Sequence, residues 1–537
     1  MNAVITTLNS KYIHSSLGIW YLLAGVKRCA PEITASVVEG TVNENMENYI
    51  ERLIAKSPDI IGFSCYIWNI SHIRAVIEKI RELLPECVIV LGGPEADCNT
   101  RELLKIADYI LRGDGEESFA GLAKCIKNNE DVSGIAGICY GSVISPPAQT
   151  KGDPCDPYSQ EYFETLSGRI AYLETSRGCP YSCAFCLSGG SNLCFFDEER
   201  AKADILRLAN SGAKTIKLVD RTFNANAARA ERLTRFIIEN YGDKIPLGIC
   251  FHFEIAGDIL SPSLLEIYSQ APIGAIQLEI GLQSFNEQTL KAVRRKTDTK
   301  KLRENIEKII SFGNIHLHID LIIGLPFEDV KSFKESFNMA FSMSPHMLQV
   351  GFLKLLHGSA MRDEPREYPC EFNETPPYAV ISTPWLSAAE IIGLHKFEDV
   401  FERIYNSGRF HRTVEYLLAA TQLSPFDLFD GIKNVPLSPA LDDFTNEIFE
   451  LFTEFEGVDK HILRDNMICD RLATNSSGVI PSALKSPDEE LRVVRRALKR
   501  RSVAILYSKD KIVYADYDEK NPITGEYKLN FIGRDIL

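Results

Sequence analysis

The sequence lacks any long apolar run. Nowhere in its 537 residues is there a stretch that approaches the ~18–20 consecutive apolar residues of a membrane-spanning helix. The first residues, Met1 to Thr6, lack the charged region and apolar run of a signal peptide. We therefore expect a cytoplasmic protein that is not inserted in a membrane.

The sequence also lacks an excess of basic residues. Lys and Arg number 59 against 73 Asp and Glu, which gives a formal net charge of −14. A surface that binds nucleic acid needs clustered positive charge, so the composition argues against a nucleic-acid partner. The basic segments around 294–301 and 492–501 are typical of solvated helix faces.

Length and cysteine content define the class of protein. At this length the chain is expected to hold about two to four domains, and 45% apolar with 25% charged residues is an ordinary globular composition. Fourteen cysteines in a reducing compartment indicate thiol or metal chemistry rather than a disulfide framework.

The first 145 residues alternate short β-branched runs with amphipathic helical stretches, which predicts a doubly wound, Rossmann-like α/β domain. We expect five strands, at 3–8, 34–38, 60–64, 88–91 and 109–112, with helices at 16–29, 46–56, 70–84, 100–106 and 116–127. Ligands of such sheets bind beyond the carboxyl ends of the strands. The loops that begin at Asn9, Ser64, Gly92 and Arg112 are therefore the expected binding loops, and two of them are rich in glycine.

A linker at 146–165 leads into a second alternating region at 166–365, which predicts a partial β/α barrel of six units. We expect strands at 170–174, 215–220, 247–253, 275–281, 317–323 and 348–353, and helices at 198–211, 227–241, 262–270, 287–311 and 330–341. In such barrels the chemistry lies at the carboxyl ends of the strands.

Three cysteines follow the first of these strands within one short loop. Cys179, Cys183 and Cys186 stand in Arg-Gly-Cys-Pro-Tyr-Ser-Cys-Ala-Phe-Cys. Thiolates select iron–sulfur clusters, zinc or Cu(I), and the common closed sites of zinc or a 4Fe-4S cluster need four ligands. Three thiolates leave one metal position open for a reagent. The alternatives are a zinc site completed by a distant His or Cys, and three unconnected buried cysteines.

The spacing Cys-x-x-x-Cys-x-x-Cys resembles the signature of the radical S-adenosylmethionine (SAM) superfamily. The resemblance implies a 4Fe-4S cluster on Cys179, Cys183 and Cys186, with SAM bound to the fourth iron and reductively cleaved to a 5'-deoxyadenosyl radical. It also implies an electron donor such as flavodoxin or ferredoxin. Asp220 stands where the family binds the SAM amino group, and Asp320 replaces the first Gly of the family's Gly-x-Ile-x-Gly-x-x-Glu motif. By the same resemblance the SAM-binding residues are Phe185, Asp220, Glu254, Gln283, Ser284, Asp320 and Gly324.

The loops of the first domain, placed ahead of this signature, resemble the cobalamin-binding domain of one radical SAM subclass. The residues that the resemblance places at cobalamin are Tyr12, His14, Ser64, Tyr66, Gly92, Gly93, Glu95, Gly113, Gly115 and Glu116. The Asp-x-His-x-x-Gly motif, whose His binds cobalt in many cobalamin proteins, is absent. The residue that faces cobalt from below therefore stays open among His14, Tyr12, Tyr66 and Trp68.

The last third, 366–537, predicts a mainly helical region. Helices are expected at 387–405, 414–423, 440–455, 461–473 and 487–500, with a small terminal α/β module of strands at 503–507, 512–516 and 526–532. It carries no motif for a reaction. The substrate, a small molecule or a peptide, is not disclosed by the sequence, and neither is the oligomeric state. Lys354, His357, Trp385 and the run 403–409 are candidates to reach the substrate.

Four functions follow from these expectations. The first is a cobalamin-dependent radical SAM enzyme that methylates an unactivated carbon. The second keeps both cofactors and catalyses an oxidation, cyclisation or rearrangement without methyl transfer. The third is a tRNA methylthiotransferase, with a second cluster on Cys29, Cys65 and Cys98. The fourth is a non-enzymatic cofactor sensor.

Overall fold

The computed structural model describes residues 1–150, 152–498 and 502–534 and divides into two compact units. The first unit comprises Met1–Ile276, Lys291–Thr297 and Phe352–Pro384, and the second comprises Gln277–Leu290, Asp298–Gly351 and Trp385–Leu537. Within the part of the chain that is described, every helix is too short or too polar to cross a bilayer.

The N-terminal domain, in the first unit, is built on a seven-stranded sheet in the order β2-β1-β3-β4-β5-β6-β7. Its strands are β1 (Asn2–Asn9), β2 (Thr34–Thr41), β3 (Ile60–Ser64), β4 (Val88–Gly92), β5 (Tyr109–Leu111), β6 (Ile138–Tyr140) and β7 (Val143–Ile144). The first five pair in parallel and are the five predicted strands. The antiparallel hairpin β6–β7 was not predicted. The order of the parallel strands reverses at β1, which is the switch point where doubly wound sheets bind ligands.

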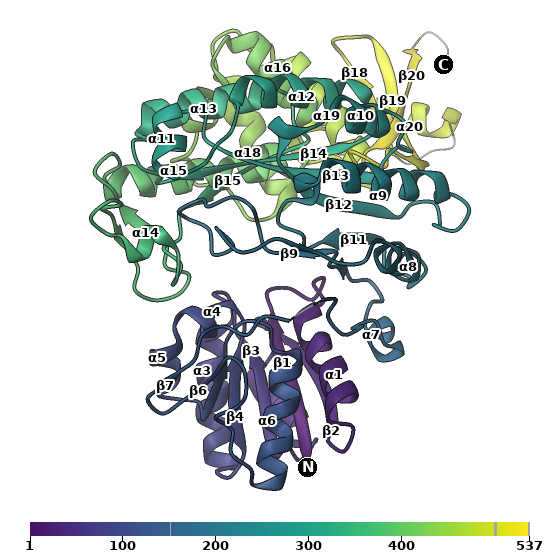
Figure 1. Cartoon of the computed structure of the whole chain (residues 1–537). Helices are drawn as coiled ribbons and strands as arrows, with labels where there is room; N and C mark the ends of the chain where they lie inside the picture. Colours follow the sequence, from purple (N-terminus) through teal and green to yellow (C-terminus); the bar gives the residue numbers. More distant parts are fainter. Residues whose placement is uncertain (151, 499–501, 535–537) are drawn as a thin grey trace. The chain divides into compact units, whose positions relative to one another are not determined.

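Helices cover both faces of this sheet. They are α1 (Leu17–Cys29), α2 (Met46–Ile54), α3 (Ile70–Leu83), α4 (Pro94–Cys98), α5 (Thr100–Leu103) and α6 (Glu116–Asn128). The apolar side chains of α3 recur at Ile70, Ile73, Ile77 and Ile80 and enter one buried cluster with those of β3 and β4, as the helical period requires. On another part of the domain α1 and α6 lie side by side (Figure 1), and Gly25 permits their close approach.

The six predicted strands of the second region are all present. In the first unit β8 (Ala171–Leu173), β11 (Thr215–Leu218) and β12 (Cys250–Ile255) pair in parallel. In the second unit β13 (Ile276–Gln283) pairs in parallel with β14 (His316–Ile323), and β15 (Met347–Phe352) follows β14 in the sheet. The remaining short elements of the first unit are α7 (Gln160–Glu164), β9 (Ser176–Arg177), β10 (Cys194–Phe195), η1 (Phe223–Ala225), η2 (Gly257–Ile259), α14 (Ala360–Asp363), β16 (Glu371–Phe372) and β17 (Val380–Ser382).

The helices between these strands agree with the expectation except at one place. They are α8 (Glu198–Ala209), α9 (Ala227–Asn240), α10 (Pro262–Ser269), α11 (Glu287–Ala292), α12 (Thr299–Phe312) and α13 (Val330–Ser342). The single helix predicted at 287–311 is wrong, because α11 and α12 are separate. Arg294 has a φ of +59°, which a right-handed helix does not admit, and the side chain of Asp298 caps a new helix by accepting from the Lys301 N–H.

The C-terminal region lies in the second unit and is mainly helical, as predicted. Its elements are α15 (Ala388–Phe401), the π-helical turn η3 (Glu402–Asn406), α16 (His411–Thr421), α17 (Pro425–Asp430), α18 (Leu441–Thr453), α19 (Lys460–Thr474), η4 (Ser482–Leu484), α20 (Asp488–Leu498), and the antiparallel strands β18 (Val503–Leu506), β19 (Lys511–Lys520) and β20 (Tyr527–Gly533). The helix predicted at 487–500 corresponds to α20, and the last two residues of the prediction, 499 and 500, lie outside the described residues.

This region also completes the edge of the last barrel strand. The side-chain amide of Asn406, in the π-helical turn, accepts from the Leu348 N–H at 3.1 Å and donates to the Leu348 carbonyl at 2.9 Å. The Tyr405 hydroxyl donates to the Pro345 carbonyl at 2.7 Å. An edge strand presents unpaired backbone groups, so these bonds satisfy part of the edge of β15.

Packing of α1 on α6 gives a stability test. A Cβ built on Gly25 would lie 2.2 Å from the Glu116 carbonyl oxygen, whereas one on Gly121, in the same helix pair, meets nothing closer than 3.9 Å. Gly25→Ala should therefore lower the free energy of unfolding by about 1–3 kcal/mol through overpacking. The matched control Gly121→Ala should be neutral or stabilising by up to about 1 kcal/mol. Urea denaturation of the full chain measures both, and equal stability of the two variants would contradict this packing.

Candidate functional site

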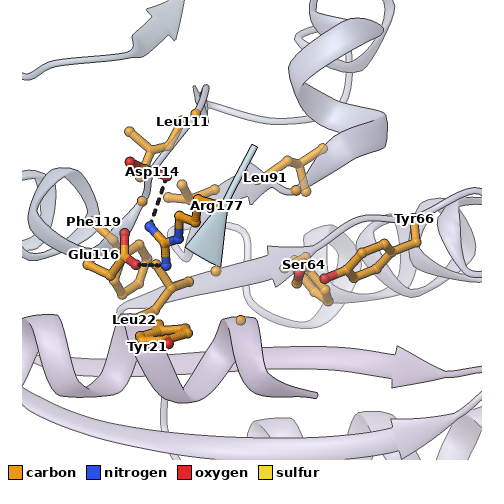
Figure 2. Close-up of a pocket in the computed structure, with 18 residues that line it drawn as sticks. Tyr21, Leu22, Ser64, Tyr66, Leu91, Leu111, Asp114, Glu116, Phe119 and Arg177 are labelled. Carbon is orange, nitrogen blue, oxygen red and sulfur yellow. Dashed lines mark hydrogen bonds and ion pairs between the residues drawn. The ribbon is translucent and has the colours of Figure 1, made fainter. Parts of the chain in front are cut away.

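The loops predicted from the first domain converge on one cavity, which is shown in Figure 2. It has a volume of about 170 Å³ and lies beyond the carboxyl ends of β3, β4 and β5. The predicted residues that line it are Ser64, Tyr66, Gly92, Gly93, Gly113, Gly115 and Glu116. We call this space the first cavity.

The walls of the first cavity are mostly apolar and close to the backbone. Leu22, Leu91, Leu111 and Phe119 project into it, as Figure 2 shows. Gly93 has a φ of +88°, and a Cβ there would lie 2.8 Å from the Cys65 carbonyl oxygen. Glycine is therefore required at this turn, and it lets a ligand approach the main chain. A narrow apolar slot with few polar groups suits a flat ring system.

A second cavity, of about 540 Å³, lies beside the first within the same unit. The two share Gly18, Tyr21, Tyr66 and Arg177 as lining residues. The other lining groups are mainly polar and come from both the N-terminal domain and the barrel strands: Asn9, Ser10, His14, Ser15, Ser16, Trp68, Tyr172, Glu174, Lys217, Arg221 and Glu254, with Leu17 and Val219. The N-terminal domain and the carboxyl ends of β8, β11 and β12 thus face a common space.

His14 and the aromatic pair Tyr66–Trp68 line this second cavity. The rings of Tyr66 and Trp68 stack with their centroids 4.3 Å apart, and Trp68 keeps 45% of its surface exposed. His14 Nδ1 lies 2.8 Å from the Tyr172 hydroxyl. Burial lowers the pKa of His14, and so do the positive charges of Lys11 and Lys217. The imidazole is therefore neutral near pH 7, the form in which a ring nitrogen can bind a metal.

Two residues predicted at cobalamin lie elsewhere. Tyr12 is 68% exposed, with its ring over the guanidinium of Arg169, and it lines neither cavity. Glu95 is buried and accepts from the Tyr378 hydroxyl and from the Asn99 side chain. The backbone of Glu95 lies at the end of β3, where its N–H donates to the Cys65 carbonyl, but its side chain is taken up by Tyr378 and Asn99. Neither Tyr12 nor Glu95 therefore belongs to the cavity that the predicted cobalamin loops form.

The three cysteines follow a tight turn fixed by glycine. Gly178 has a φ of +92°, and a Cβ there would lie 2.2 Å from the Asn192 carbonyl oxygen. Cys179 and Cys183 are buried, and Cys186 and the neighbouring Phe185 are partly exposed. The loop is pinned by backbone bonds from Ala184 N–H to the Val293 carbonyl and from Met361 N–H to the Ala184 carbonyl.

The surroundings of the thiols are polar on one side. Arg295 Nη1 donates to Cys183 Sγ at 3.5 Å, and Cys179 Sγ lies 3.7 Å from Thr222 Oγ1. Burial raises the pKa of the Cys183 thiol, and the guanidinium of Arg295 acts against this shift. A positive group beside a cysteine favours its thiolate form, and the thiolate is the form that binds a metal.

The three cysteine sulfur atoms are not grouped tightly around one point. Among residues 1–150, 152–498 and 502–534, the ligand atoms of Glu279, His318 and Asp320 all lie within 4.8 Å of one another, and those of the three cysteines do not. Thiolates on one tetrahedral zinc, each about 2.3 Å from it, would approach one another to about 4 Å. The sulfur positions are therefore not those of a closed site for a single zinc ion.

Asp220 holds the strand that leads into the cysteine loop. Its buried carboxylate accepts from the Thr175 N–H at 2.7 Å, the Thr175 hydroxyl at 2.6 Å and the Ser176 hydroxyl at 2.6 Å. Burial raises its pKa. Asp220 is thus a positioning residue for the loop, and contact with the SAM amino group stays a prediction.

The other residues predicted at SAM divide between the two units. In the first, Lys217 Nζ lies 3.5 Å from Glu254 Oε1. In the second, His318 Nε2 lies 2.9 Å from Asp320 Oδ1. Gln283 and Gly324 end their strands with φ values of +74° and +94°. Glu254 and Gln283 lie at the carboxyl ends of β12 and β13, Gly324 directly follows β14, and Asp320 lies within β14. Their contact with SAM stays a prediction.

Ser284 does not present its hydroxyl to a ligand, contrary to the prediction. It is fully buried and donates to Glu328 Oε1 at 2.5 Å, and Ser336 lies 3.3 Å from the same oxygen. Burial raises the pKa of Glu328 to about 7. The three residues form an internal polar cluster behind the loop that follows β14.

Lys354 and His357, the candidates for the substrate, do not line the cavities described above. Lys354 is exposed and bridges to Ala379 through its backbone. The His357 ring stands edge-on to Tyr378, with centroids 5.0 Å apart, and burial lowers its pKa. Cys65, proposed for a second cluster, belongs to the apolar core of the N-terminal domain.

Sequence reasoning missed Arg177, which lines three cavities of the first unit. Arg177 lines the first cavity, the second, and a third of about 480 Å³ along Gly178, Ser191 and Asn192. It donates to Asp114 at 2.9 Å, to Glu116 at 2.6 Å and to Glu174 at 3.0 Å. Two signals pointed to it: an Arg two positions before Cys179, and the acidic run 114–117.

Comparison with known proteins agrees with this arrangement. Residues 3–123 match the family model of the B12 binding domain, residues 173–340 that of the radical SAM superfamily, and residues 366–524 that of a protein of unknown function, DUF4080. The chain thus contains a B12-binding domain and a radical SAM domain. The cofactors of these domains are a 4Fe-4S cluster, SAM and cobalamin.

Individual relatives are distant. The chain is 25% identical over 312 residues to the cobalamin-dependent radical SAM methyltransferase TokK of Streptomyces tokunonensis, covering 54% of this chain and 46% of TokK. It is 24% identical over 327 residues to the anaerobic magnesium-protoporphyrin IX monomethyl ester cyclase of Cereibacter sphaeroides, covering 56% of this chain and 52% of the cyclase. The chain thus spans about half the length of these relatives.

Solved structures share the fold. The cobalamin-dependent SAM radical enzyme OxsB, solved with aqua-cobalamin and SAM, superimposes with a TM-score of 0.60 at 15% identity, over 93% of this chain and 80% of OxsB. The radical SAM methyltransferase TsrM of Kitasatospora setae, solved with cobalamin and a 4Fe-4S cluster, gives 0.56 at 16% identity, over 67% of this chain and 74% of TsrM.

The residues present fit these cofactors. Three thiols on one pinned loop provide a ligand set for the cluster. The first cavity is bordered by the backbone of Gly93 and Gly113, two turns at which any Cβ would collide with the backbone of Cys65 or Ala148. The buried Glu116 Oε2, which borders this cavity, has no hydrogen-bond partner in the described chain and can accept from a bound ligand.

The raised pKa of Glu328 predicts a pH-dependent stability. A carboxyl whose pKa is about 7 in the folded chain and about 4.3 in the unfolded chain takes up a proton on folding between these values, so stability falls as the pH rises through this window. Glu328→Gln, neutral at every pH, should remove that part of the fall. We expect its melting temperature to match the wild type near pH 5 and to exceed it near pH 8.

The exposed Glu335, on α13, supplies the control. Glu335→Gln should leave the difference in melting temperature between pH 5 and pH 8 unchanged. The same pH dependence in Glu328→Gln and in the wild type would show that Glu328 is ionised in the folded protein.

Proposed function

We propose that this chain is a cobalamin-dependent radical SAM enzyme that methylates an unactivated carbon of a small-molecule or peptide substrate. The observation that carries the proposal is the sharing of Arg177 and Tyr66 by adjoining cavities, one beside the cobalamin loops and one beside the barrel strands. Similarity to TokK, a methyltransferase by name, supports methyl transfer.

The chain's own groups define what each site would do. When bound, the cluster and SAM supply a 5'-deoxyadenosyl radical, and cobalamin supplies a methyl group. Cys179, Cys183 and Cys186 would hold the cluster. The stacked rings of Tyr66 and Trp68 would give the second cavity one apolar aromatic wall.

Polar groups of the second cavity would orient the substrate. Lys217 and Glu254 form an ion pair on neighbouring strands, and the Tyr172 hydroxyl lies beside them. A cavity with both charge signs and hydroxyl groups suits a polar substrate that both donates and accepts hydrogen bonds. His14, neutral and half-buried there, is the candidate among the four predicted residues to bind cobalt from below.

An electron donor is part of the proposal, because reductive cleavage of SAM needs one electron. A flavodoxin or a ferredoxin is the class of protein that supplies such electrons. A cytoplasmic location and a reducing, oxygen-poor setting accompany this proposal.

A second candidate is a radical reaction without methyl transfer, such as an oxidation or cyclisation. The similarity to the anaerobic cyclase favours it, since that relative covers a comparable share of the chain. The same cavities and the same cysteine loop would serve either reaction.

Anaerobic reconstitution with iron and sulfide, followed by cobalamin, SAM and dithionite, tests the proposal. We expect about four iron atoms and about one cobalamin per chain, with both 5'-deoxyadenosine and S-adenosylhomocysteine as products. 5'-Deoxyadenosine with no methyl turnover at cobalt would favour the second candidate.

Variants of the cysteine loop separate the two cofactors. The triple replacement of Cys179, Cys183 and Cys186 by Ala should abolish iron binding and SAM cleavage while cobalamin binding persists. Cys125→Ala, on α6 and outside the described cavities, is the control and should keep full iron content. Retention of a SAM-cleaving cluster by the triple variant would refute the assignment.

A further inference from the structure

Arg177 joins the cysteine loop to the glycine-rich loop of the N-terminal domain. Its guanidinium reaches across more than 60 residues of sequence to Asp114 and Glu116, as Figure 2 shows by dashed lines. It also binds both oxygens of Glu174 at the end of β8, at 3.0 and 3.1 Å. One side chain therefore bridges the two regions from which the cofactor sites are built.

The guanidinium is held in a fixed orientation. The ring of Tyr21 lies 5.1 Å from its central carbon, and that of Phe196 lies 5.9 Å away. Its backbone pairs with Cys194 in the short β9–β10 ladder. Since only Gly178 separates Arg177 from Cys179, and Gly178 is confined to one turn conformation, a shift of Arg177 is transmitted to the first thiol.

This ion network contains more acid than base. One guanidinium faces three carboxylates, those of Asp114, Glu116 and Glu174. The side chain of Glu116 is only 4% exposed, and its Oε1 is bound to Arg177. Its Oε2 has no hydrogen-bond partner among the described residues and lies on the wall of the first cavity. A buried carboxylate oxygen without a donor is costly, so the network is completed by a ligand that brings one.

We propose that Arg177 is a positioning residue that couples the two cofactor sites. Glu116 Oε2 accepts a hydrogen bond from an amide or hydroxyl of the corrinoid. This bond fixes the position of Arg177, and Arg177 in turn fixes the position of the cysteine loop. The inference rests on the proposed function, because it requires part of a corrinoid to enter the first cavity and a cluster to bind the cysteines. Amides at the rim of a corrinoid ring are donors of the kind that this oxygen lacks.

Coupling of this kind is reciprocal and measurable without turnover. The full chain is prepared anaerobically with and without its cluster, and the affinity for aquocobalamin is measured by its visible absorbance after equilibrium dialysis. We expect the cluster-containing wild type to bind aquocobalamin at least about fivefold more tightly than the cluster-free wild type. In Arg177→Lys the ratio should fall to about one, because a single ammonium cannot bridge three carboxylates in the fixed fork geometry.

Two further variants complete the design. In Glu116→Gln the side-chain amide has only one oxygen. If that oxygen accepts from Arg177, the amide NH2 replaces the free acceptor by a donor; if it faces the cavity, the bond to Arg177 is lost. Either way the variant should bind aquocobalamin about tenfold more weakly in the cluster-containing chain. Arg200→Lys is the matched control, because Arg200 also lies by the Phe196 ring, 5.7 Å away, but pairs with Asp153 and Asp204 instead. Its affinity ratio should equal that of the wild type.

Each result decides the inference. Equal affinity of the two wild-type forms, or a ratio that persists in Arg177→Lys, overturns it. If Arg177→Lys does not fold, as judged by its circular dichroism, Asp114→Asn takes its place, and persistence of the wild-type ratio there overturns it. A chain that binds no aquocobalamin in either form overturns the proposed function as well, whereas binding with no dependence on the cluster overturns this inference alone.

Discussion

The ion network of Arg177 with Asp114, Glu116 and Glu174 is the interaction on which both sites depend. It lies where the carboxyl ends of the N-terminal strands meet the first barrel strand within one compact unit. Exposed ion pairs contribute little, but this guanidinium is three-quarters buried, sandwiched by aromatic rings and bound to three carboxylates. Removal of Arg177 would leave three partly buried carboxylates without their cation, so this one side chain holds the arrangement.

Glycine and aspartate prepare the loops that this network joins. Gly93 and Gly178 adopt backbone conformations that side chains would block, so the cavity wall and the entry to the cysteine loop have fixed shapes. Asp220, which follows β11, accepts three hydrogen bonds from Thr175 and Ser176 and so holds the chain that leads into the cysteine loop. The loops around the first cavity and the cysteines are therefore held by short polar bonds near the ends of parallel strands.

Much of the fold was accessible from the sequence, because buried parallel strands such as β3 and β4 are nearly continuous apolar runs. The loops that line the first cavity were predicted together because strand ends of a parallel sheet share one edge. What failed depended on distant partners. Glu95 binds Tyr378, 283 residues away, and Arg177 binds Glu116 across 61. No local pattern encodes such pairs. The break at Arg294 was missed because its helical periodicity continues on both sides.

The central claim is that cobalamin and the cluster lie next to each other in this one chain, with Arg177 between them. The most direct test is electron paramagnetic resonance of the full chain loaded with both cofactors and reduced so that Co(II) and the cluster are both paramagnetic. The account predicts magnetic coupling, seen as broadening of each signal relative to chains that hold one cofactor. Two unperturbed, additive signals at full occupancy of both sites would contradict it.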